Sequence, residues 1–227
     1  MNKLSIVMPV YNEKNLILDV LKKVREINIP GKEIELIVVD DFSTDGTREF
    51  LKEHGNKFAN VVLFHDYNQG KGAALKTGFG AITGDVAIVQ DADFEYDPME
   101  IPSVVAPIFN GEVDVCYGSR FLNKDYKGYK KNQVANKVLT NLSNLMTGLK
   151  VTDMETCYKA FKADFIKNID IVEKRFGFEP EITAKVAHAK LSLKEVPISY
   201  YPRTKEEGKK INLKDGFRAL YCIAKYR

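Results

Sequence analysis

The stretch KLSIVMPVYNEKNLILDVLKKVREINIPGKEIELIVVDD, residues 3–41, decides the fold. It begins and ends with short apolar runs rich in β-branched residues. Between the two runs lies a helical pattern of apolar side chains formed by Leu16, Val20, Leu21 and Val24. Because neither run alternates with polar residues, both strands should be buried on two faces, as in a parallel sheet covered by helices.

The same pattern continues up to about residue 100. We predict a capped helix in 43–55, strands in 60–66 and 85–93, and a glycine-rich loop followed by a helix in 70–82. The fold class is therefore predicted as α/β, with a mostly parallel central sheet flanked by helices.

The second half of the chain has a different pattern of residues, with a basic loop and a basic tail. We predict strands at 114–122 and 193–202, a basic loop at 123–131, and helices at 132–150, at 175–191 and in the basic tail, 203–227. The apolar stripe of the helix at 132–150 fits either a core-capping helix or a surface-binding one; it consists of Val134, Val138, Leu142, Leu145 and Leu149. The tail likewise fits a membrane surface or a solvated terminal helix.

The composition excludes several classes of protein. The 227 residues are 44% hydrophobic and 29% charged with a net charge of +3, which is typical of a globular protein without a nucleic-acid surface. The three cysteines form no C-x-x-C pair, so neither a disulfide framework nor a zinc ribbon is indicated. With no signal peptide and no long apolar run, we expect a protein that is soluble or lies at a membrane surface.

Polar residues follow four of the predicted strands, in 9–13, 40–41, 66–72 and 91–95. Ligands of such sheets bind outside the carboxyl ends of the strands, so these residues predict a nucleotide-sized crevice. No G-x-G-x-x-G or P-loop motif is present. Lys71, between two glycines, fits either a phosphate contact or a solvated lysine at the start of a helix.

The acidic run VAIVQDADFEYDP, residues 86–98, directs Asp91, Asp93 and Glu95 to one face of an extended chain. Such like charges favour a divalent cation between them. A helix-loop-helix calcium site is excluded, because its sixth and twelfth positions lack the required Gly and Glu. A solvated acidic turn closed by Pro98 is the alternative.

Six motifs in fixed order carry a family resemblance: IVMPVYNE, VVDDFSTDGT, NQGKGAALKTG, DAD, GSR and PRTKEEGKKI. Together they resemble the family 2 glycosyltransferases of the GT-A fold, over nearly the whole chain. The most similar branch is that of polyprenyl-phosphate sugar transferases, such as dolichyl-phosphate mannose and glucose synthases. The resemblance implies one catalytic domain over 1–227, with a nucleotide-sugar half (1–95) and an acceptor half (96–227).

The resemblance also implies roles for individual residues. The donor would contact Pro9, Tyr11, Glu13, Asp40, Asp41, Lys71, Asp91, Ala92 and Asp93. A divalent cation, Mg²⁺ or Mn²⁺, would be held by Asp91, Asp93 and Glu95. The acceptor phosphate would be met by Arg120, Lys130, Lys131, Asp153, Glu155, Arg203 and Lys209, and catalysis would rest on Asp93, Arg120 and Arg203.

Two positions depart from the family pattern. Glu95 stands where the mannose synthases carry a glutamine, which adds a negative charge to the cation site and leaves the donor preference open. Lys130 and Lys131 stand where other members carry an arginine, so a bidentate phosphate clamp is not assured there.

The predicted reaction is inverting transfer of a hexose from a UDP- or GDP-sugar to dolichyl or undecaprenyl phosphate. A phosphate acceptor ionises near pH 6 and needs no general base, which agrees with the absence of an E-D and Q-x-x-R-W pair. A glycan hydroxyl acceptor, with Asp153 or Glu155 as base, is the alternative; a nucleotidylyltransferase and a non-catalytic nucleotide-binding module are more remote. We expect peripheral attachment at the cytoplasmic face of a membrane, with a membrane subunit as a further candidate partner.

Overall fold

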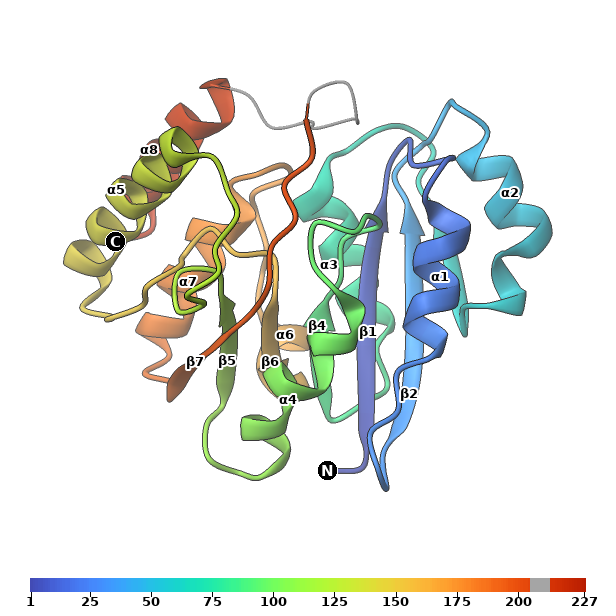
Figure 1. Ribbon diagram of the computed structural model, residues 1–227, viewed down its shortest axis with the longest axis horizontal. Helices are drawn as coiled ribbons and strands as arrows, with labels where there is room; N and C mark the ends of the chain where they lie inside the picture. Colours follow the sequence, from blue (N-terminus) through green and yellow to red (C-terminus); the bar gives the residue numbers. More distant parts are fainter. Residues whose placement is uncertain (205–212) are drawn as a thin grey trace.

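The computed structural model describes residues 1–204 and 213–227 (Figure 1). Strands β1 (Lys3–Val10) and β2 (Glu33–Asp40) pair in parallel along their whole length, from Lys3 opposite Glu33 to Val10 opposite Asp40. Helix α1 (Ile17–Arg25) crosses between them and buries three side chains of the predicted helical pattern, Val20, Leu21 and Val24. The fourth, Leu16, lies just before the helix and is half-buried. The predicted strand-helix-strand unit is confirmed.

One seven-stranded sheet runs through the molecule in the order β3-β2-β1-β4-β6-β5-β7. The remaining strands are β3 (Val61–Phe64), β4 (Val86–Val89), β5 (Val115–Ser119), β6 (Lys159–Lys162) and β7 (Leu193–Pro197). The further helices are α2 (Thr47–His54), α3 (Lys71–Ala81), α4 (Ile101–Phe109), α5 (Lys130–Thr147), α6 (Ala163–Asn168), α7 (Phe178–His188) and α8 (Leu213–Lys225), with short 3₁₀ turns at Gly55–Lys57 and Pro98–Glu100. The predicted α/β class with a mostly parallel sheet is confirmed.

Strand β6 is the exception to the parallel order, and the sequence did not predict it. It runs antiparallel between β4 and β5, with Ala160 opposite both Ile88 and Cys116. Its KAFK sequence is short and begins and ends with lysine, so it shows no apolar run. Lys159 is nevertheless fully buried, because its ammonium donates to the carbonyl oxygens of Met154 and Thr156 at 2.6 Å each.

Two groups of helices lie on different parts of the sheet. Helix α3 packs on β1 and β2, while α5, α7 and α8 pack against one another beyond β5 (Figure 1). Because β1, β2 and β4 run parallel to one another, their carboxyl ends lie together at the top of the sheet in Figure 1. No helix within 1–204 or 213–227 has both the length and the apolar character needed to cross a bilayer.

Candidate active site

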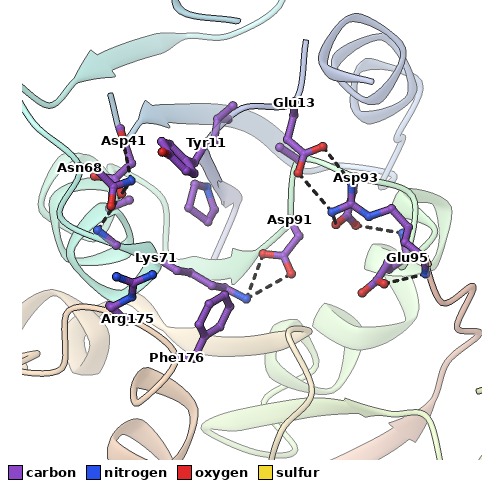
Figure 2. Close-up of a pocket in the computed structure, with 16 residues that line it drawn as sticks. Tyr11, Glu13, Asp41, Asn68, Lys71, Asp91, Asp93, Glu95, Arg175 and Phe176 are labelled. Atoms are coloured by element: carbon purple, nitrogen blue, oxygen red, sulfur yellow. Dashed lines mark hydrogen bonds and ion pairs between the residues drawn. The ribbon is translucent and has the colours of Figure 1, made fainter. Parts of the chain in front are cut away.

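A cavity of about 330 Å³ lies at the carboxyl ends of β1, β2 and β4 (Figure 2). It is lined by Pro9, Val10, Tyr11, Glu13, Asp41, Asn68, Gly70, Lys71, Ala74, Asp91, Ala92, Asp93, Glu95, Arg175, Phe176 and Arg203. The structure thus brings eight of the nine predicted donor residues to one cavity; the exception is Asp40. Their contact with a donor stays a prediction.

Asp40 and Asp41 follow each other in sequence but have different surroundings. Asp40 is fully buried and pairs with Arg48 at 2.7 Å, away from the cavity lining. Asp41 accepts hydrogen bonds from the backbone N–H groups of Gln69 (2.9 Å) and Gly70 (2.7 Å). It also contacts His65 Nδ1 at 2.7 Å. Asp41 therefore fixes the loop that leads into α3.

The two glycines around Lys71 allow a close approach by the chain itself. A Cβ atom at Gly70 or Gly72 would collide with the backbone of Lys174 or Glu173, and Gly70 has a φ of +98°. Ala73 N–H donates to the Lys174 carbonyl at 3.1 Å. This packing carries the next residues, Arg175 and Phe176, into the cavity, although no motif in their stretch pointed to the site.

The side chain of Lys71 extends across the cavity toward Asp91 (Figure 2). Its ammonium lies 3.0 Å from Asp91 Oδ1 and 3.2 Å from Glu179 Oε1. Burial alone would lower the pKa of Lys71, but the negative charges around it, led by that of Asp91, outweigh burial and raise the pKa well above its usual value. Lys71 is thus a permanent positive charge beside the acidic run, and not a solvated lysine.

Asp91, Asp93 and Glu95 are each held by a basic residue, and Asp93 and Glu95 share Arg203. Asp91 faces Lys71, Asp93 Oδ2 lies 2.5 Å from Arg203 Nη2, and Glu95 accepts from the Arg203 backbone N–H at 2.8 Å. Burial, with the nearby charge of Asp91, raises the pKa of Asp93 to about 7. Within the described residues no three Asp, Glu, His or Cys side chains are gathered as a ready metal site.

Arg203, in the segment that follows β7, lines the cavity. Besides Asp93, its guanidinium contacts both carboxylate oxygens of Glu13, at 2.9 and 3.1 Å. Arg203 therefore lies across the ends of β1 and β4. Lys209, the other predicted acceptor residue of the PRTKEEGKKI motif, lies outside the described residues.

A second cavity of about 1000 Å³ adjoins the first and shares Lys71, Asp91, Glu95, Phe176 and Arg203 with it. Arg120 lines it and makes a bidentate pair with Asp153, at 2.7 Å for each bond. Glu155 also lines it, as do the rings of Tyr96, Tyr126, Tyr129 and Tyr200.

The other predicted acceptor residues differ in position. Lys130 and Lys131 are exposed at the start of α5 and do not line the second cavity. Asp153 is fully buried and committed to Arg120. Glu179, which the sequence analysis did not single out, lines the cavity from α7. Helix α7 buries Glu179 together with Glu181 and Thr183, so an acid in this helix did not by itself mark Glu179 as a site residue.

Several known proteins are similar to this chain in sequence. The sequence model described as "Glycosyl transferase family 2" matches residues 5–170. A dolichol-phosphate mannosyltransferase of Pyrococcus furiosus is 26% identical over 91% of this chain and 59% of its own length. A UDP-N-acetylglucosamine–dolichyl-phosphate N-acetylglucosaminyltransferase of Methanococcus voltae is 28% identical over 96% of this chain and 93% of its own length. The chain spans only 51% and 62% of two further curated relatives.

Among solved structures, glucosyl-3-phosphoglycerate synthase from Mycobacterium tuberculosis is similar over the whole chain. In its complex with Mn²⁺, UDP and glucosyl-3-phosphoglycerate it has a TM-score of 0.76 and 20% identity, covering 99% of this chain and 80% of that one. At this identity the likeness concerns the fold alone, and it confirms the predicted GT-A architecture.

Proposed function

The chain belongs to glycosyl transferase family 2, and from this premise we propose that it moves a hexose from a UDP- or GDP-sugar to a polyprenyl phosphate, with inversion and with a divalent cation. One observation carries the proposal. The acidic run lies where two cavities meet, between Lys71 on one side and Arg203 on the other. A donor in the first cavity and an acceptor in the second would come together at this junction.

The first cavity suits a nucleoside diphosphate. Its volume of about 330 Å³ falls in the range of small-molecule sites. Tyr11 offers an aromatic surface at one end, beside the loop that Asp41 fixes, and Lys71 offers a positive charge at the other. The relatives named above include an enzyme that uses a UDP-sugar.

The acidic run suits a hard divalent cation such as Mg²⁺ or Mn²⁺, because Asp91, Asp93 and Glu95 all offer carboxylate oxygens. Burial is the first cause of the raised pKa of Asp93, and the repulsion from Asp91 that adds to it is what a bound cation would relieve. Asp91, Asp93 and Glu95 would hold the ion, and when bound it would neutralise the charge that develops on the leaving diphosphate. Lys71 and Arg203 are placed to bind the same phosphates.

The second cavity suits a phosphate acceptor more than a hydroxyl. Asp153, one of two candidate bases, is neutralised by its bidentate pair with Arg120. A lipid monophosphate needs no base, and it would attack the anomeric carbon directly, which gives inversion. The two similar relatives are named for dolichol or dolichyl phosphate.

A hydroxyl acceptor is the second candidate, and Glu155 is the observation that favours it. Burial, with the charge of Glu179, raises the pKa of Glu155 to about 8, which is the direction a general base requires. Under this alternative a soluble glycan would be glycosylated at high pH, and Glu155→Gln would abolish turnover.

A membrane surface is the proposed location, with the cytoplasmic face the side that nucleotide sugars reach. Helices α5 and α8 pack side by side (Figure 1). Six apolar side chains on them are exposed: Val134, Val138, Leu145, Phe217, Leu220 and Tyr221. We name these six the α5–α8 apolar face. Lysines and an arginine are exposed on the same helices, at Lys130, Lys131, Lys137, Lys214 and Arg218. Apolar residues with a basic surround suit an anionic lipid surface, and a membrane subunit is the competing occupant.

A transfer assay tests the proposal. UDP-glucose, UDP-N-acetylglucosamine and GDP-mannose, each radiolabelled in the sugar, are offered with dolichyl or undecaprenyl phosphate, with Mn²⁺, Mg²⁺ or chelator. We expect one donor to label the lipid, with the label lost under chelator and in Asp93→Ala. Glu53→Gln, which changes an exposed carboxylate on α2, is the matched control. Label that persists under chelator would refute the cation, and label on a soluble glycan alone would refute the phosphate acceptor.

A further inference from the structure

Two carboxylate oxygens in the second cavity have no hydrogen-bond partner among the described residues, Glu155 Oε1 and Glu179 Oε2. The side chain of Glu179 is only 6% exposed. Native proteins rarely leave such buried atoms unsatisfied, because the lost hydration is costly. An unpartnered buried oxygen on a residue that lines a cavity indicates a ligand group that donates a hydrogen bond.

The cations nearby do not fill this role. Lys159 donates to the carbonyl oxygens of Met154 and Thr156, and Arg120 directs its guanidinium at Asp153. Lys71 reaches only the other oxygen of Glu179, at 3.2 Å. Burial and the charge of Glu179 raise the pKa of Glu155 to about 8, so near neutral pH Glu155 holds a proton and can donate as well as accept.

The position of the pair relative to the acidic run indicates which part of a substrate it meets. Lys71 touches Asp91 and Glu179 with the same ammonium. Tyr11 and Asp41 line only the first cavity, whereas Glu155 and Glu179 line only the second. A nucleotide sugar with its base near Tyr11 and its phosphates at the acidic run would therefore extend its sugar toward the two glutamates.

We propose that Glu155 and Glu179 select the transferred sugar, by hydrogen-bonding hydroxyl or amide N–H groups of a neutral hexose and by excluding a sugar that carries a carboxylate. The inference rests on the proposed function and adds the chemical class of sugar to it. A site built to bind hydroxyl groups discriminates strongly against a ligand that cannot donate to it. A uronate carboxylate would meet the negative charge of Glu179, whose nearest cation is already shared with Asp91.

Stability and affinity should move in opposite directions at Glu155. Glu155→Leu removes a carboxyl group whose Oε1 has no hydrogen-bond partner among residues 1–204 and 213–227, so the melting temperature should stay the same or rise while sugar binding falls. Glu155→Gln keeps the size and the hydrogen-bonding groups and should retain most of the affinity. A purely structural glutamate would instead lose melting temperature when replaced by leucine.

Calorimetric titration, with Mn²⁺ present, separates the sugar from the nucleotide. Wild type, Glu155→Leu, Glu155→Gln, Glu179→Gln and the control Glu53→Gln are titrated with UDP, GDP, UDP-glucose, UDP-N-acetylglucosamine, GDP-mannose and UDP-glucuronate. We expect wild type, Glu155→Leu, Glu155→Gln and Glu53→Gln to bind the preferred diphosphate equally, whereas Glu179→Gln, which frees Lys71 from one of its two carboxylates, is judged by its sugar nucleotide affinity relative to its own diphosphate affinity. The preferred neutral sugar nucleotide should bind roughly 10- to 100-fold more weakly to Glu155→Leu and Glu179→Gln, and UDP-glucuronate should bind wild type no better than UDP.

Three outcomes would overturn the inference. They are equal affinity of all variants for the sugar nucleotide, a parallel loss of diphosphate affinity and melting temperature in Glu155→Leu, or tight binding of UDP-glucuronate by wild type. Failure of the proposed function has a different signature. In that case the sugar contributes to binding through the glutamates, but no polyprenyl phosphate is labelled.

Discussion

The ion pair between Arg120 and Asp153 allows the acceptor side of the site to be tested through stability. Two guanidinium N–H groups donate to the two carboxylate oxygens at 2.7 Å, and the Arg120 backbone N–H adds a bond of 3.0 Å. The side chains are 7% and 0% exposed. Asp153→Asn would remove the negative charge while leaving the guanidinium buried.

The size of the effect follows from burial. Two unit charges about 4 Å apart interact by about 4 kcal/mol at an effective dielectric constant of about 20, and breaking a buried pair from one side costs about 3–5 kcal/mol. We expect Asp153→Asn to lower the free energy of unfolding by that amount. For a chain of this length the melting temperature should fall by about 6–20 °C.

Urea unfolding followed by circular dichroism measures this directly. Arg120→Met should cost a similar amount, and Arg120→Met combined with Asp153→Leu should cost much less than the sum of the single changes, since no charge is left unpaired. Glu112→Gln, which breaks the exposed pair with Lys194, is the control and should have little effect. A loss below about 1 kcal/mol for Asp153→Asn, or additive losses in the double variant, would refute the buried pair.

Three further predictions concern other parts of the molecule. Burial raises the pKa of Glu35, but hydrogen bonds from Lys3, Ser5 and Thr83 outweigh it and lower the pKa to about 2. The stability it contributes is therefore present above its usual pKa of 4.5 and is lost as the pH falls toward 2, so the urea midpoint of Glu35→Gln should vary less with pH in this window than that of wild type. Gly72→Ala should displace the backbone at Glu173 and weaken UDP or GDP binding in calorimetry; unchanged affinity would contradict the packing described. Leu145→Ser with Phe217→Ser, on the α5–α8 apolar face, should reduce co-sedimentation with anionic vesicles several-fold without changing diphosphate affinity, and undiminished co-sedimentation would exclude this face as the lipid contact.

The sequence alone predicted the parallel half of the fold because its strands are continuous apolar runs. β1 and β2 are buried between helices, so their central residues, 6–8 and 36–39, are all apolar and the pattern is unambiguous. β6 has only four residues, and its buried Lys159 depends on carbonyl oxygens that come together only in the folded loop. The local sequence pattern therefore gives no indication of the carbonyl oxygens that bind the Lys159 ammonium.

The same distinction applies to the site. The residues at the strand ends were found because polar side chains directly after an apolar strand are conspicuous, as at Tyr11 and Asp91. Arg175, Phe176 and Glu179 arrive from a segment about 100 residues away, brought in by backbone packing against the glycines around Lys71. The ion pair that occupies Asp153 could not be predicted either, since it joins residues 33 positions apart.

The chemical nature of the linkage in the product decides most directly between a phosphate and a hydroxyl acceptor. Polyprenyl phosphate incubated with the preferred sugar nucleotide and Mn²⁺ would be examined by phosphorus and proton magnetic resonance. Sugar transfer to the phosphate predicts that the phosphomonoester signal is replaced by a phosphodiester signal coupled to the anomeric proton, in the β configuration from an α-linked donor. An unchanged phosphomonoester signal, accompanied by glycosylation of a hydroxyl group, would contradict the proposed acceptor. A phosphodiester of α configuration would contradict inversion.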